Sequence, residues 1–163
     1  MISSLTMWLT LQMFPPLVMT KQLQVGLYAC MWHNGTLYSR SLTHIGNSLV
    51  LYYANGDTSS EPVPALIKYI YHPCKCMFIF TVQHQLPVAT QTLDPFQHYP
   101  DFPAKLYLSQ LQDELELVKP EWIVAHFACW KISADHVVVL SLFKIGFSHL
   151  RYPNERCQLI PWD

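Results

Sequence analysis

The segment from Pro64 to Leu86 constrains the fold more than any other part of the chain. It holds two apolar runs, Leu66–Tyr71 and Met77–Val82, separated by the short break His72-Pro73-Cys74-Lys75. Both runs are rich in Ile, Phe, Tyr and Val, which suit a pleated and half-buried surface. Each run has the usual length of a strand, and Pro73 cannot donate a ladder hydrogen bond. The segment therefore predicts a β-hairpin whose buried faces build the core.

Further strands and turns are indicated on both sides of this hairpin. Before it, strand candidates occur at Val25–Trp32 and Ser48–Tyr53, and after it at Ile123–Trp130 and Val137–Phe143. The two Asn-Gly pairs, Asn34-Gly35 and Asn55-Gly56, predict tight turns, because both residues of such a pair accept positive φ. One such turn is Asn34-Gly35-Thr36, which is also a glycosylation sequon; without an export signal the turn interpretation is favoured.

The strand faces give a list of core residues. Side chains alternate across a strand, so one face of each strand must find the others in the interior. On this basis we expect burial of Ile67, Ile70, Phe78, Phe80, Val138 and Leu140.

Length and composition fit one globular domain. The chain has 163 residues, 51% hydrophobic and only 13% charged, so it can build a sizeable core. We predict a mostly β fold, a partly open, twisted barrel of six to eight strands with little helix and one long proline-containing loop. Residues 1–24 are expected to be an extended segment, with Leu5 to Met13 alternating at period two. Residues 25–150 form the domain, and residues 151–163 a loosely held tail.

Charge and cysteine content exclude some classes of function. The net charge is −1 and there is no run of Lys and Arg, so no strong binding to nucleic acid is expected. Five cysteines form no regular framework, which favours reduced thiols in an intracellular protein. The first twenty residues are interrupted by polar side chains and by Pro15-Pro16, and so predict no membrane span.

The stretch from Pro87 to Pro103 predicts a long surface loop. It carries four prolines without a clear period, and its aromatic residues would pin it to the domain. Asp94, His98 and Asp101 on this loop could form a carboxylate–histidine cluster for acid–base chemistry if they converge. Asp-Pro turn chemistry is the competing interpretation of the same residues.

Other reactive side chains give little support for a metal or a nucleophile. His72, Cys74, Cys76 and His84 have the wrong spacing for a structural zinc site, which pairs ligands two to four residues apart in two groups. His126 and Cys129 are three apart in a predicted strand and face opposite sides. No phosphate-binding, dinucleotide or hydrolase motif is present. We therefore expect no enzyme activity, no catalytic or metal residues and no cofactor.

Aromatic residues are the remaining candidates for binding. Tyrosine and tryptophan rings can cage a methylated ammonium group through cation–π attraction, although core packing is their commoner role. Six of them lie near predicted strand ends or turns, and all but Tyr69 are taken as peptide-binding candidates: Tyr52, Tyr53, Tyr69, Tyr71, Trp122 and Trp130.

The segment KLYLSQLQDELELVKPEWIVAHFACW, residues 105–130, resembles the second half of a bromo-adjacent homology (BAH) domain. Leu106-Tyr107-Leu108-Ser109 and Val118–Ile123 stand where that family has an apolar pair with a serine and a closing strand. Val63-Pro64-Ala65-Leu66-Ile67 resembles the family's strand after a proline, and the likeness covers roughly residues 46–142. The acidic stretch Asp113–Glu116 departs from members that dock on nucleosomes, and no matched positions identify a methyl-lysine cage.

The whole chain is also similar to uncharacterised proteins encoded beside fungal transposase genes, in the stretches GNSLVLYY, TLDPFQHYPDFPAKLY and WIVAHFACWK. The two resemblances imply a non-catalytic protein-interaction module in a chromatin or mobile-element context. Its partner would be a protein or peptide such as a histone tail, and its location intracellular, in the nucleus. Two alternatives stay open: a small enzyme that uses Asp94, His98 and Asp101, and a domesticated or decaying transposon-associated remnant without activity.

Overall fold

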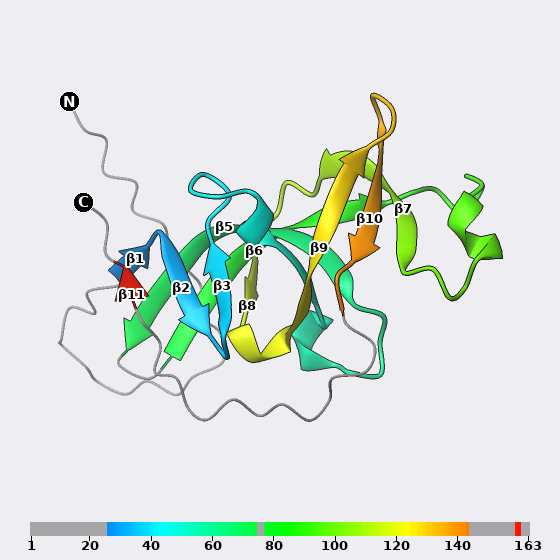
Figure 1. Ribbon diagram of the computed structural model, residues 1–163. Coiled ribbons are helices and arrows are strands. Elements are labelled where there is room, and N and C mark those ends of the chain that lie inside the picture. The colour runs from blue at the N-terminus through cyan, green and yellow to red at the C-terminus, as the bar shows by residue number, and fades with distance from the viewer. Residues whose placement is uncertain (1–25, 75–76, 144–158, 161–163) are drawn as a thin grey trace, which may run out of the picture.

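The computed structural model describes residues 26–74, 77–143 and 159–160 (Figure 1). The predicted N-terminal extended segment lies outside the described residues, as do the side chains of Cys74 and Cys76 and most of the predicted tail. Leu159–Ile160, within that tail, form strand β11.

Strands are the main secondary structure of the described residues. The large sheet contains eight of them, and a second sheet of order β11-β2-β3 contains the other three. In chain order the strands are β1 (Gly26–Tyr28), β2 (Cys30–His33), β3 (Thr36–Ser39), β4 (Leu49–Tyr52), β5 (Val63–Cys74), β6 (Met77–Pro87), β7 (Ala104–Leu111), β8 (Glu116–Val118), β9 (Ile123–Lys131), β10 (His136–Ser141) and β11 (Leu159–Ile160). Helical structure in this part of the chain is limited to single 3₁₀ turns, η1 (Gly46–Ser48), η2 (Ala54–Gly56), η3 (Pro95–His98) and η4 (Pro120–Trp122).

The hairpin predicted from the apolar runs is present as β5 and β6, which pair antiparallel along their length. The first strand continues through His72 and Pro73 to Cys74, so the break begins later than the sequence suggested. The register shifts between Tyr71 and Cys74, where Pro73 has no N–H to contribute to the ladder. An irregularity of register therefore accommodates the proline without ending the strand.

Both predicted Asn-Gly turns are confirmed. Asn34 and Gly35 join β2 to β3 with φ of 50° and 72°. Asn55 and Gly56 lie in η2 with φ of 56° and 75°. Positive φ at two successive positions is the geometry that makes Asn-Gly favourable there.

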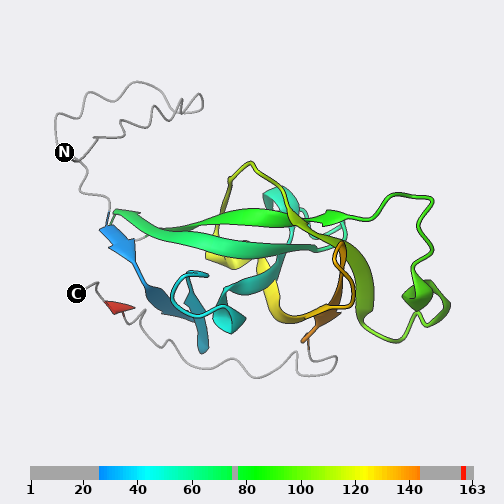
Figure 2. The ribbon, with the colours of Figure 1, turned by 90° about the horizontal axis from the view of Figure 1, so that it is seen from above.

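Six strands of the large sheet close on themselves. Its order is β1-β5-β4-β9-β10-β7-β6-β8, and β5 also pairs with β6, which completes a ring of six strands. The ring is not evenly arranged round an axis, so the fold is mostly β and only partly barrel-like (Figures 1 and 2). This is the fold class that the sequence predicted.

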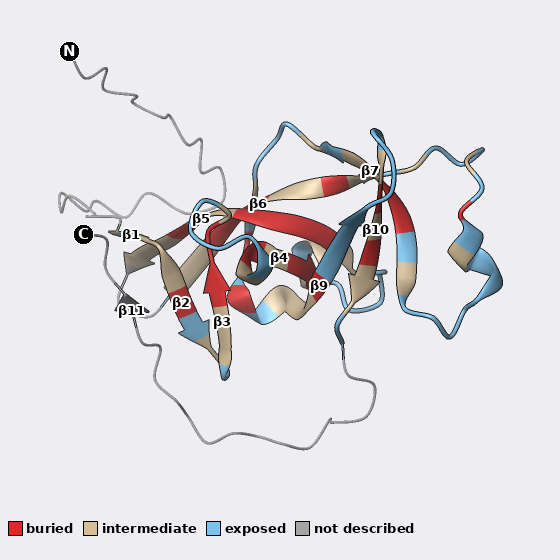
Figure 3. Cartoon of the chain, turned by 45° about the horizontal axis from the view of Figure 1, so that its top comes forward, coloured by how far each residue is buried: buried red, intermediate tan, exposed pale blue. Residues whose placement is uncertain are grey.

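The interior is filled by two groups of apolar side chains. The larger group lies mainly on β4, β5 and β6, with further residues from β2, β3 and β8. It includes the predicted core residues Ile67, Ile70 and Phe80, all fully buried. Phe78 is half-buried and packs against this group. Figure 3 shows the burial concentrated in these central strands.

The predicted inward face of β10 is wrong. Val137 and Val139 are buried, whereas Val138 and Leu140 are half-buried. The run from Val137 to Leu140 is apolar at every position, so it has no alternation from which to choose a face. The smaller core group, with Leu51, Tyr107 and Phe127, decides which valines turn inward.

The long loop spans residues 88–103 between β6 and β7 and contains η3. It projects from the end of the molecule opposite β1 and β11 (Figures 1 and 2). No helix in the described residues is long and apolar enough to span a membrane.

Candidate functional site

The loop carboxylate Asp94 supports the backbone. Its residue is only 4% exposed. One carboxylate oxygen accepts a hydrogen bond from the Phe96 N–H at 2.9 Å, and the other from the Leu106 N–H at 3.1 Å. Asp94 thus begins η3 and fastens the loop to β7, as Asp-Pro turn chemistry predicts.

The two other residues of the predicted trio lie elsewhere on the loop. His98 and Asp101 are exposed and line a shallow hollow with Tyr99, Pro100 and Phe102, a lining that does not include Asp94. Among residues 26–74, 77–143 and 159–160, no three His, Cys, Asp or Glu side chains are placed to hold a metal ion. The structure therefore separates the buried carboxylate from the two exposed groups.

A second hollow lies between the loop and the ring of strands, and we call it the loop-face hollow. It has a volume of about 310 Å³ and shares Pro100 and Phe102 with the first. Its lining comes from four parts of the chain: Leu51, Glu61, Pro62, Pro100, Phe102, Pro103, Ala104, Lys105, Val139 and Ser141.

The floor and rim of the loop-face hollow differ in character. Leu51 and Val139, two members of the smaller core group, are buried beneath it. Phe102 stays 51% exposed on the loop side. At the rim the Lys105 ammonium donates to both carboxylate oxygens of Glu61, at 2.7 and 2.8 Å. An apolar floor with one paired charge at its edge is a composition typical of a binding surface.

The five aromatic candidates do not form one cage. Tyr52 is fully buried, Tyr53, Tyr71 and Trp122 are half-buried, and Trp130 is 74% exposed. Tyr52 and Trp122 belong to or pack against the larger core group, and the Tyr53 N–H donates to the Trp122 carbonyl. These three gather where β4 ends.

The remaining two candidates lie apart from that corner. Tyr71 lies beside Tyr69, with ring centroids 5.9 Å apart, toward the other end of β5. Trp130 lies near the tip of the β9–β10 hairpin, whose exposure Figure 3 shows. The Trp122 ring already makes a cation–π contact within the chain, because the Lys119 ammonium lies 5.4 Å from the centroid of the ring.

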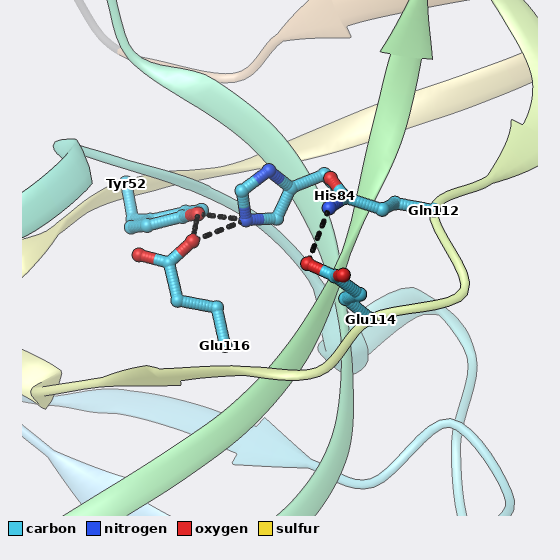
Figure 4. A network of polar contacts seen from close by, with 5 residues as sticks. All are labelled: Tyr52, His84, Gln112, Glu114 and Glu116. Carbon is cyan, nitrogen blue, oxygen red and sulfur yellow. Dashed lines mark hydrogen bonds and ion pairs between the residues drawn. The ribbon is translucent and has the colours of Figure 1, made fainter.

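A polar network that the sequence analysis did not identify joins Tyr52, His84 and Glu116 (Figure 4). The Tyr52 hydroxyl donates to Glu116 Oε2 at 2.8 Å, and His84 Nε2 lies 2.5 Å from the same oxygen. The Tyr52 hydroxyl and His84 Nε2 are also within hydrogen-bonding distance of each other.

Strand register explains why these residues meet. Strand β5 lies between β4 and β6, and its residue Ala65 pairs with Val50 on one side and with His84 on the other. Glu116 lies opposite Val82, two residues before His84. The three side chains therefore share the inward face, at the point where β6 exchanges its partner β8 for β7. The only sequence signal for this network was the presence of Tyr52 and His84 at inward-facing positions of two apolar strands.

Tyr52 is a proton donor in this network. Burial, then the hydrogen bond to Glu116 and its negative charge, raise the pKa of Tyr52 far above its ordinary value. Tyr52 therefore keeps its proton and donates it, while the side chains of His84 and Glu116 are 22% and 31% exposed. Because their polar atoms are directed at one another, the network mainly ties β8 to β4 and β6.

Other proposed ligands are also apart. His72 stacks on Phe78 with centroids 4.4 Å apart. Met77 pairs with Cys74 at the end of the hairpin, and His84 comes seven residues later in the same strand. Seven strand residues span about 23 Å. His84 thus lies far from the hairpin end that carries His72. In β9, the His126 Nδ1–H donates to the Leu49 carbonyl, and Cys129 is exposed.

Comparison with known proteins adds no family to these observations. The chain matches no protein-family model, and neither curated proteins nor solved structures gave a match. The resemblance to BAH domains therefore rests on the residues quoted for it, and the function has to be argued from the geometry.

Proposed function

We propose that this protein is a non-catalytic interaction module that binds an extended peptide segment of a partner protein at the loop-face hollow. The observation that carries the proposal is the hollow itself, with buried Leu51 and Val139 below and the half-exposed Phe102 ring beside it. We infer that the peptide inserts an apolar side chain against this floor.

Burial of apolar area supplies the attraction in this scheme. Binding energy in protein interfaces concentrates in a few apolar or aromatic side chains that fill pockets, surrounded by polar groups at the rim. Phe102 and the 65%-exposed Tyr99 are aromatic side chains already outside the core, so a partner can cover them. The Lys105–Glu61 pair offers backbone or side-chain hydrogen bonds at the edge.

The composition supports a protein partner more than a nucleic acid. A net charge of −1 provides little long-range attraction to phosphates. The resemblance to BAH domains supports an interaction role in a chromatin or mobile-element context and suggests a histone tail as partner. A nuclear location belongs to the same proposal.

The alternative of a small enzyme has less support. It requires Asp94, His98 and Asp101 to converge, whereas both oxygens of Asp94 accept backbone N–H groups. The alternative of an inactive remnant makes no structural demand, and the experiment below distinguishes it by its lack of binding.

The test is a titration of the purified chain with methylated and unmethylated histone-tail peptides and with duplex DNA, each at two salt concentrations. We expect peptide binding that changes little with salt, because burial of apolar surface is screened much less than charge. Phe102→Ala should weaken it by about tenfold, the effect of losing roughly 1.4 kcal/mol of contact. Trp130→Ala is the matched control, since this exposed aromatic side chain does not line the hollow.

Tight, salt-sensitive DNA binding without a peptide response would contradict the proposal. Equal loss of peptide binding in the Phe102 and Trp130 variants would contradict the assigned surface. If neither the peptides nor the DNA bind, the result favours the alternative of an inactive remnant.

A further inference from the structure

The chain contains two Asn-Gly pairs in turns, with nearly the same φ angles at both residues. Asn34-Gly35 and Asn55-Gly56 both have positive φ at each residue. In an Asn-Gly pair the main-chain nitrogen of the glycine can attack the side-chain amide carbon of the asparagine, because glycine has no Cβ to obstruct the approach. The two pairs therefore allow one chemistry to be compared in two environments.

The glycine nitrogens have different surroundings. The Gly56 N–H donates to the Tyr53 carbonyl at 3.0 Å, and the Trp122 indole lies against this glycine, 2.6 Å from where a Cβ would be. Around Gly35 nothing lies within 4 Å of that position, and no acceptor in the described part of the chain receives its N–H. The glycine nitrogen that would act as the nucleophile is therefore hydrogen-bonded and covered at Gly56, but accessible at Gly35.

A histidine stands beside the leaving group in the free turn. His33 Nε2 lies 3.1 Å from the Asn34 side-chain nitrogen. An amide nitrogen can only donate, so in this bond the Asn34 Nδ2–H donates to His33 Nε2. When attack makes Asn34 Cγ tetrahedral, the nitrogen gains a lone pair. Histidine exchanges a proton readily near neutral pH, so His33 in its protonated form is placed to donate to that nitrogen as it departs. Among the bonds of the described residues, no comparable group contacts the side-chain amide of Asn55.

We propose that Asn34 is a modification site, at which the β2–β3 turn deamidates with assistance from His33. The Gly35 nitrogen loses its proton to solvent and bonds to Asn34 Cγ, while the Cγ–Nδ2 bond breaks and the nitrogen leaves as ammonia with the proton that His33 delivers. Water then opens the resulting succinimide to aspartate or isoaspartate. No electrons are gained or lost, and solvent water is the only co-reactant.

The product changes the turn. Either acid adds a negative charge at the exposed tip of the hairpin, beside His33. Isoaspartate also inserts an additional backbone carbon into a two-residue turn, whose length sets the pairing of His33 with Thr36. The modification is therefore expected to loosen the β2–β3 end of the small sheet.

The experiment is incubation of the folded full-length protein at neutral pH, followed by proteolysis and mass spectrometry of the peptides that carry Asn34 and Asn55. Asn34 should deamidate at least about fivefold faster, because Gly56 must first lose a hydrogen bond and its cover. In urea the two rates should become similar. The variant His33→Gln should slow Asn34 alone.

Equal rates in the folded protein, or faster reaction at Asn55, would overturn the choice of site. So would a difference of the same size in urea, which would assign the preference to sequence instead of structure. An unchanged Asn34 rate in the His33→Gln variant would remove His33 from the reaction.

Discussion

The β5–β6 hairpin and the loop of residues 88–103 both carry prolines and aromatic side chains, but they use them in opposite ways. The hairpin places Phe80 and its neighbours in the core, and accommodates Pro73 by a register shift. The loop leaves Tyr99 and Phe102 exposed and buries the carboxylate of Asp94. The hairpin is thus held largely by apolar packing, and the loop by hydrogen bonds, which include the two to the Asp94 carboxylate and one from the Ser141 N–H to the Pro103 carbonyl.

This difference separates folding from binding. In the hairpin, the apolar side chains of one strand face are buried in the core. In the loop, apolar side chains stay exposed beside the loop-face hollow, where a partner can contact them. A loop anchored by one buried acid can present aromatic side chains without their taking part in the core.

The largest expected effect is in the hairpin. Phe80→Ala should lower the free energy of unfolding by about 3–5 kcal/mol, since it removes a fully buried ring and leaves a cavity. Denaturant unfolding measures this directly. An unchanged denaturation midpoint would contradict the conclusion that apolar packing holds the hairpin.

Removal of the loop anchor should have the next largest effect. Asp94→Ala leaves the Phe96 and Leu106 N–H groups without their acceptor, which should cost about 1–3 kcal/mol. Asp101→Ala, an exposed acid on the same loop, is the control and should change stability by less than about 0.5 kcal/mol. Equal effects of the two substitutions in thermal or denaturant unfolding would show that the loop is not held by Asp94.

Alkaline pH tests the buried tyrosines of the ring. Burial raises the pKa of Tyr107 to about 12 and raises that of Tyr52 further, with Glu116 adding to the latter. The unfolded chain then loses protons first, so stability is complete below about pH 10 and declines as pH rises toward the folded pKa. Each tyrosine contributes at most about 1.4 kcal/mol per pH unit. Tyr107→Phe should flatten the decline measured by unfolding between about pH 9 and 11, and an unaltered slope would contradict the assignment.

Local patterns were sufficient to predict much of the scaffold. The apolar runs of the hairpin and the two Asn-Gly turns occur where the sequence indicated. The inward face of β10 was not predictable, because four successive apolar residues fit either face and Tyr107 and Phe127 make the choice.

The sites depend on pairings between distant residues. Tyr52 and His84 are 32 residues apart in the chain, as are His84 and Glu116, and the three meet only through the register of β4, β5, β6 and β8. The loop-face hollow likewise requires Leu51, Phe102 and Val139 to come together from three separate segments. Sequence periodicity reports the face of a strand but not its neighbours, so neither arrangement could be inferred from it.

The separation of folding from binding predicts different free energies of unfolding for the variants Phe102→Ala and Phe80→Ala, measured side by side. Phe102 is a large aromatic side chain that is half exposed on the loop, so its removal should change stability by less than about 0.5 kcal/mol. Its loss should instead appear in peptide binding. A destabilisation comparable to that of Phe80→Ala would show that the loop aromatics belong to the core and would contradict the separation of folding from binding.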